Sequence, residues 1–98
     1  MQLSEELKSI LKEKLFLIGE LDEKIKPYLK GWTMDRIGKT DLAILRLAVY
    51  EIFYRDDIPY KVSINEAVEL AKSFCDDASP SFINGVLAGV VNSLSEEK

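Results

Sequence analysis

The sequence predicts an all-α protein, a compact helical subdomain of four main helices plus one short helix. Apolar residues recur at three- and four-residue steps near both ends of the chain, which is the period of amphipathic helices. Residues 40–54 are apolar almost throughout and rich in Leu and Ala. No alternating pair of strand-like runs is present. We expect one domain in the 98 residues, with residues 1–26 forming the first helix and residues 27–98 the rest.

The first predicted helix ends near Lys26. Its apolar stripe consists of Leu7, Leu11, Leu15, Ile18, Leu21 and Ile25. Ser4 is placed to cap the helix, and Glu5 and Glu6 lie at the positive end of its dipole. Pro27 disfavours helical geometry at the residue before it, so the helix should end or kink there.

A glycine-flanked segment, residues 27–39, should contain one short helical turn between loops. The following run, residues 40–54, predicts the central helix because a helix that is apolar on all sides is buried on most of them. Thr40 or Asp41 can cap it. Beyond the cap, Arg46 is one of only two charged residues in this helix, and we expect it to pair with a carboxylate or to cap carbonyl groups.

The third main helix is predicted over residues 63–74. Ser63 and Glu66 have the spacing of a capping box, in which each side chain bonds the other residue's amide. The apolar face would consist of Ile64, Ala67, Val68, Ala71 and Phe74. Asn65 has two interpretations, a residue that defines the fold or a part of a binding surface.

The last helix should be capped by Ser79, with Pro80 at its favoured first position. Its apolar stripe consists of Ile83, Val86, Leu87, Val90 and Leu94. Asn84 and Gly85 disfavour a helix in its first turns. Either Gly85 allows close helix packing while Asn84 bonds a neighbouring backbone, or a partner approaches this surface closely.

The composition argues against an enzyme. The chain has no histidine, so the usual general base and the commonest metal ligand are both missing. The acids beside Cys75 should raise the pKa of its thiol, and the paired aspartates at 56–57 and 76–77 lack the spacing of a calcium loop. We expect no catalytic residue, no cofactor and no metal.

Net charge, hydropathy and cysteine content indicate in which compartment the protein works and which classes of partner it binds. The net charge of −4, without a basic cluster, argues against a free-standing nucleic-acid binder. No apolar run is long enough to span a membrane, and the charged N-terminus lacks the apolar block of a secretory signal. A single cysteine fits a reducing cytosol, so we expect a cytoplasmic protein.

Several aromatic residues have two interpretations. Phe82, near the start of the last helix, could stack on a base while free amides face phosphate, or it could cover the core. Tyr28, Trp32, Tyr54 and Tyr60 are placed around the predicted loops, where aromatics serve as interface anchors or close the ends of a core.

Four motifs in order resemble the C-terminal half of the NusB family of bacterial transcription antitermination factors. They are "DLAILRLAVYE" at 41–51, "IPYKV" at 58–62, "INEAVELAK" at 64–72 and "FINGVL" at 82–87. Residues 18–32 resemble the preceding helix and linker of the family. The resemblance implies an all-α fold built of two small helical subdomains.

The resemblance also implies partners. Family members bind boxA RNA together with a small-subunit ribosomal protein, called NusE in this role, and the complex joins RNA polymerase. On this basis the partner-binding residues would be Trp32, Arg36, Asp41 and Tyr60, and the residual RNA contacts would be Ser81 and Phe82. The structural motif would consist of Ser63, Asn65, Glu66, Asn84 and Gly85, which fix the last two helices against each other.

Members of the family normally begin with an arginine-rich first helix and a second helix, and neither is recognisable in this sequence. We therefore expect weak RNA binding by this chain alone. We also expect exposure of Leu11, Leu15 or Phe16 on the first helix, leading to a homodimer or a rearranged helix. Two alternatives stay open: a truncated helical scaffold without RNA binding, and an RNA-binding accessory module like that of ribosomal RNA cytosine methyltransferases.

Overall fold

The computed structural model describes residues 4–96, with side chains to residue 94, and within them the fold is all-α, as predicted. The α-helices are α1 (Glu5–Ile25), α2 (Lys39–Tyr54), α3 (Tyr60–Phe74) and α4 (Ser79–Glu96). The single short helical turn expected between α1 and α2 is instead two 3-10 turns, η1 (Lys26–Tyr28) and η2 (Met34–Arg36). The described part of the chain contains no strand.

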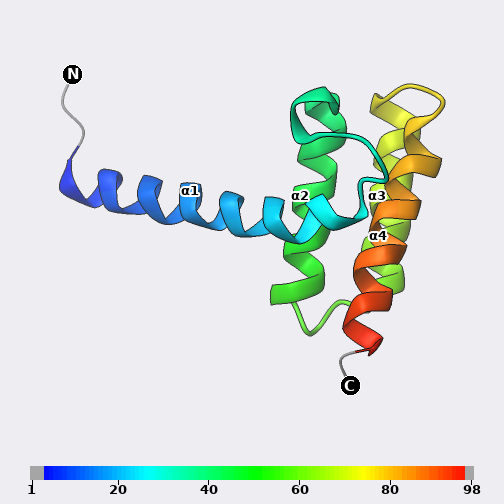
Figure 1. Cartoon of the computed structure of the whole chain (residues 1–98). Helices are drawn as coiled ribbons and strands as arrows, with labels where there is room; N and C mark the ends of the chain where they lie inside the picture. The colour runs from blue at the N-terminus through cyan, green and yellow to red at the C-terminus, as the bar shows by residue number, and fades with distance from the viewer. Residues whose placement is uncertain (1–3, 97–98) are drawn as a thin grey trace.

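Helices α2, α3 and α4 form a bundle, and α1 crosses it and extends well beyond it (Figure 1). The radius of gyration of 14.7 Å exceeds the value of about 13 Å expected for a compact chain of this length. Its longest extent is 43 Å and its shortest 24 Å. The excess comes from the N-terminal half of α1, which packs against no other element.

Local signals at both ends of α1 are confirmed. The Leu7 amide donates a hydrogen bond of 3.1 Å to the Ser4 hydroxyl, so Ser4 is the N-cap. The α-helix ends at Ile25, two residues before Pro27, and continues as the 3-10 turn η1. The sequence rules for caps and proline therefore set the limits of this helix.

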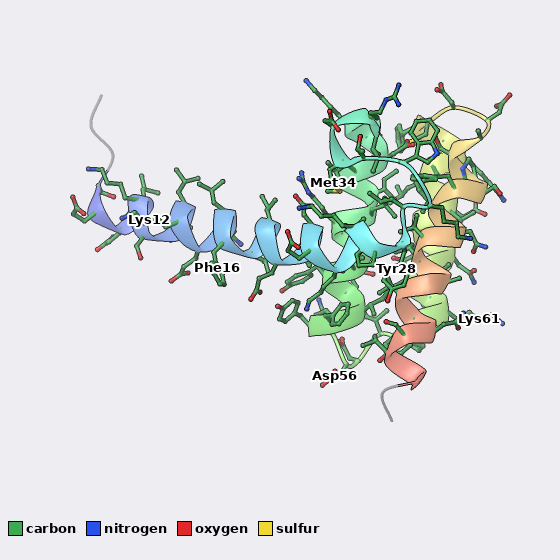
Figure 2. The ribbon with its side chains drawn as sticks, viewed as in Figure 1. Lys12, Phe16, Tyr28, Met34, Asp56 and Lys61 are labelled. Carbon is green, nitrogen blue, oxygen red and sulfur yellow. The ribbon has the colours of Figure 1, made fainter. Side chains whose placement is uncertain are left out.

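Only the C-terminal part of the α1 stripe enters the core. Leu21 and Ile25 are buried, whereas the predicted exposure of Leu11, Leu15 and Phe16 is confirmed. Phe16 has 70% of its surface accessible and projects from the free half of the helix (Figure 2). The homodimer inferred from this surface stays a prediction.

The core lies where the four helices meet. Helix α2 packs against α1, α3 and α4, as expected for a central helix. The fully buried large side chains include Ile25, Leu45, Val49, Ile83, Leu87 and Val90. An ion pair fixes α1 on α2: Arg46 donates from Nε and Nη2 to the two carboxylate oxygens of Asp22, each at 2.8 Å. The carboxylate of Asp22 is therefore the partner that the sequence led us to expect for Arg46.

The capping box predicted at Ser63 is wrong. Helix α3 begins at Tyr60, because Pro59 holds an extended conformation at the N-cap and its carbonyl accepts from the amides of Val62 and Ser63. Ser63 therefore lies inside the helix, buried, and its hydroxyl has no hydrogen-bond partner among the described residues. Glu66 is exposed on the helix surface.

The apolar face predicted for α3 is correct at Ala67 and Ala71, which are buried, and wrong at Phe74. Phe74 is 71% exposed because it is the last residue of the helix, where the apolar stripe runs past the core.

The caps predicted for α2 and α4 also differ from those in the structure. Helix α2 begins at Lys39 with Gly38 as its N-cap, so neither Thr40 nor Asp41 caps it. Helix α4 begins at Ser79 itself, and the Ser79 hydroxyl donates to Asp41 across the bundle rather than accepting from its own helix. A tertiary partner therefore replaces the local cap.

The prediction that Gly85 allows close helix packing is wrong as well. A Cβ atom built on Gly85 meets no heavy atom within 4 Å, and Asn84 is exposed. The close contact lies one turn later, where a Cβ on Gly89 would come within 2.7 Å of Tyr28 Cδ1. Figure 2 shows Tyr28 between the end of α1 and α4, so it is η1 that α4 approaches at this glycine.

Candidate functional site

A cleft of about 380 Å³ lies where the loop around η2 and the start of α2 face the start of α4. We call it the acidic cleft. It is lined by Trp32, Arg36, Asp41, Asp76, Ser79 and Phe82, together with Ile37, Gly38 and Ala78. Three of the four predicted partner-binding residues and one of the two predicted RNA-binding residues therefore share one depression.

A second depression of about 230 Å³ adjoins the first, and we call it the glycine hollow. Its lining includes both predicted RNA-binding residues, Ser81 and Phe82, and also Gly85 of the predicted structural motif. Tyr28, Leu29, Lys30, Trp32 and Val86 complete it. Sequence patterns did not single out Lys30, although its place before a glycine in a loop is typical of an exposed turn.

A sharp turn brings the loop back onto α4. Lys30 has a φ of 51° and Gly31 a φ of 93°, both in the left-handed region, which glycine adopts freely and lysine rarely does. The Trp32 amide then donates to the Leu29 carbonyl at 3.2 Å. This reversal places Trp32 beside α4.

Trp32 and Phe82 form an aromatic wall between the two depressions. Their ring centroids are 6.2 Å apart at an interplanar angle of 66°, the edge-to-face arrangement that aromatic pairs favour. Trp32 remains 54% exposed, and Phe82 is half-buried against the core. Phe82 therefore covers the core, which agrees with one of its two interpretations, and it also lines both depressions, whereas base stacking stays a prediction.

Asp41 is held in place by α4. The Ser79 hydroxyl, only 7% exposed, lies 3.1 Å and 2.9 Å from the two carboxylate oxygens of Asp41. Burial, followed by the hydrogen bond to Asp41 and the negative charges of Asp41 and Asp76, raises the pKa of the Cys75 thiol to about 11. The direction agrees with the sequence prediction, and the thiol is protonated at neutral pH rather than a reactive thiolate.

The two depressions differ in charge. Two carboxylates, Asp41 and Asp76, face the acidic cleft against one guanidinium, Arg36, which is exposed and forms no ion pair with the described residues. Lys30 is the only charged residue in the lining of the glycine hollow. The acidic cleft therefore suits a cationic group, and the glycine hollow suits a group that carries negative charge.

Tyr60 lies apart from both depressions. It is the first residue of α3 and is 37% exposed. Helix α3 begins at the end of the bundle opposite the loop between α3 and α4 (Figure 1). Asn65 and Glu66 lie on the exposed face of α3, also outside these depressions. The structure thus groups Trp32 with Arg36 and Asp41, but it does not bring Tyr60 to them.

Metal and membrane signals were also sought in the described residues. No group of three or more His, Cys, Asp or Glu side chains there could hold a metal ion. None of the helices in that part of the chain has the length and hydropathy needed to cross a membrane.

Comparisons with known proteins identify the family. The model of the NusB family matches residues 3–92. The chain is 53% identical over 78 residues to the transcription antitermination protein NusB of Bacillus pumilus, a match that covers 80% of this chain and 60% of the relative. Against the protein of the same name from Acetivibrio thermocellus the identity is 60% over 72 residues, covering 74% of this chain and 50% of the relative.

A third relative, the NusB protein of Listeria welshimeri, is 55% identical over 72 residues, which cover 74% of this chain and 56% of the relative. This chain thus spans between half and three fifths of the length of these relatives. The family match extends over nearly all of the chain, including the residues that line both depressions. The chain therefore belongs to the NusB family.

Proposed function

We propose that this chain is an antitermination module that docks on a small-subunit ribosomal protein of the NusE type through the acidic cleft. It takes up boxA-type RNA weakly alone and more strongly with that partner, and it reaches RNA polymerase only through the complex. Family membership supports this role, because the relatives are named transcription antitermination proteins. The observation that carries the proposal is the grouping of Trp32, Arg36 and Asp41 around one cleft.

The cleft has the chemistry of a protein-docking site. An exposed tryptophan is a common interface anchor, because it buries a large apolar surface with little loss of conformational freedom. Asp41 is oriented by Ser79 before any partner arrives, so the partner does not have to order it. Together with Asp76 it can accept from a lysine or arginine of the ribosomal protein, while Arg36 can donate to an acceptor.

Weak RNA binding by the chain alone follows from its charge. The net charge is −4, and lysines and arginines are scattered rather than clustered, so counterion release contributes little to affinity. Ser81 and Phe82, in the first turn of α4, would supply the RNA contacts from this side. A ribosomal protein docked in the neighbouring cleft would supply the positive charge that this chain lacks.

Titration calorimetry of the chain with the NusE-type ribosomal protein tests the proposal. We expect a dissociation constant in the micromolar range or tighter, and a loss of about tenfold or more for Trp32→Ala, since central aromatic anchors contribute at least that much. Phe16→Ala is the matched control, because Phe16 is also an exposed aromatic side chain, 70% accessible against 54% for Trp32, but it lies on the free half of α1.

Tyr60→Ala shows whether the docking surface continues to the far end of α3. A folded chain that gives no heat and no complex would contradict the proposal. It would favour the alternative of a helical scaffold without the activity.

A further inference from the structure

The free half of α1, residues 5–16, carries an apolar face that no other described residue covers. Leu17 is the first residue of this helix that packs against the core. Before it, four large apolar side chains at three- and four-residue steps are each about half exposed: Leu7, Ile10, Leu11 and Leu15. A helical stretch of about twelve residues is marginal in water without tertiary packing, so a surface that covers this face stabilises the helix.

Positive charge accompanies the apolar face. Lys14 lies within it, three residues after Leu11, and Lys12 lies on its edge, three residues before Leu15. Both lysines are exposed, and neither takes part in an ion pair of the described residues. The acids of the free half lie outside the apolar stripe; they are Glu5, Glu6 and Glu13. A complementary cover for this face therefore combines apolar side chains with carboxylates.

Helices α2 and α3 form a narrow groove of that composition, which we call the α2–α3 groove. Leu47 and Glu51 line it from α2, and Glu66 and Leu70 line it from α3. Its floor consists of buried residues, namely Ile44, Ala48, Ser63 and Ala67. The volume of the groove is only about 10 Å³, about the space of one water molecule, so a partner lies over its rim rather than inside it.

The rim of the groove is both apolar and acidic. Leu47 is 51% exposed and Leu70 is 37% exposed. Glu51 and Glu66 take part in no ion pair of the described residues, and no lysine or arginine lines the groove. A hollow of about 440 Å³ shares Glu66 and Leu70 and continues this surface along α3, again without a basic residue in its lining. The surface therefore suits an amphipathic helix with lysines beside its apolar stripe.

We propose that the free half of α1 docks in the α2–α3 groove of a second copy of this chain. Its apolar stripe lies against Leu47 and Leu70, while Lys12 and Lys14 face the carboxylates of the rim. The free half points away from its own bundle, so the groove that it covers belongs to another copy (Figure 1).

Reciprocal docking gives a closed two-fold dimer, in which each copy covers the apolar face of the other. The lining of the groove shares no residue with the acidic cleft or the glycine hollow. The dimer is therefore independent of the proposed function.

The experiment measures sedimentation velocity of the full chain over a wide range of concentration and of salt. The groove variant is Glu51→Lys with Glu66→Lys, and the free-half variant is Lys12→Glu with Lys14→Glu. Leu70→Gln weakens the apolar contact without changing the charge. Circular dichroism checks that each variant is folded.

The matched control is Asp56→Lys with Asp77→Lys. It changes the net charge as much as the groove variant does, but these two exposed carboxylates line neither the groove nor the two depressions. The control should leave the dissociation constant of the dimer as in the parent chain.

The parent chain should sediment as a dimer that weakens as salt is added. The groove variant and the free-half variant, each alone, should raise the dissociation constant of the dimer about tenfold or more, because like charges then face each other. An equimolar mixture of the two should form a dimer again, since each reversed free half meets a groove of opposite charge. Leu70→Gln should also weaken the dimer.

Three results would overturn the proposal. A parent chain that stays monomeric at every concentration would show that no second copy docks. A folded groove variant or Leu70→Gln chain that dimerises as tightly as the parent would show that the groove is not the surface used. Loss of ribosomal-protein binding in the groove variant, with the dimer retained, would assign the groove to that partner instead.

Discussion

The ion pair between Asp22 and Arg46 should be a measurable part of the stability, because it ties α1, which extends beyond the bundle, to the central helix α2. Both contacts measure 2.8 Å, and the two side chains are 20% and 32% exposed. The hydrogen bond to Asp22 raises the pKa of Arg46 against the opposing effect of burial, so the guanidinium is charged at every working pH.

The expected coupling free energy of this ion pair lies between the values known for exposed and for fully buried pairs. Exposed pairs contribute about 0.2–1 kcal/mol, whereas removing one partner of a fully buried pair costs about 3–5 kcal/mol. A bidentate pair that is one fifth to one third exposed should give a coupling free energy of about 1–2 kcal/mol. Asp22→Asn should cost a similar amount, because it leaves the guanidinium half-buried beside a neutral amide.

A double-mutant cycle measures this coupling directly. Asp22→Asn, Arg46→Met and the double variant are unfolded in urea and followed by circular dichroism, with the slope of the transition checked for constancy. The pair of Glu69 and Lys72 in α3 is the control, since its side chains are 71% and 58% exposed, and its coupling should be close to zero. A coupling for Asp22 and Arg46 no larger than that of the control would refute the reasoning.

Three further predictions concern packing, titration and association. Gly89→Ala should destabilise the chain by about 1–3 kcal/mol in urea, because its Cβ overlaps Tyr28, and an unchanged midpoint would contradict the close contact. The Cys75 thiol should titrate near pH 11 by thiolate absorbance. Since its folded pKa is raised from 9.0, the contribution of this thiol to stability should be constant below about pH 9 and should be lost as the pH rises towards 11, a loss that Cys75→Ser should abolish. Leu7 and Leu11 are each about half exposed, so replacing both by Gln should reduce the binding of an apolar dye. The same change should reduce the concentration dependence of the sedimentation coefficient. A parent chain that sediments as a monomer at every concentration would count against the homodimer.

The sequence by itself determined the features that depend on neighbouring residues. The cap at Ser4, the end of α1 before Pro27 and the apolar stripe of α4 follow from rules that act within a few residues. The four family motifs also came from the sequence alone, and the family match confirms them. Charge in a near-apolar helix indicated that Arg46 needs a partner, although not which one.

Only the tertiary structure decided what lies across from each residue. Ser63 looked like a cap because the local pattern allowed it, but Pro59 starts the helix earlier and leaves that hydroxyl buried. Ser79 bonds Asp41 rather than its own helix because α2 lies within reach. Gly85 and Gly89 look alike in the sequence, yet one opens a hollow and the other touches Tyr28. Periodicity shows which face of a helix is apolar, whereas the position of the next helix decides where that face is covered, and residues distant in the sequence set that position.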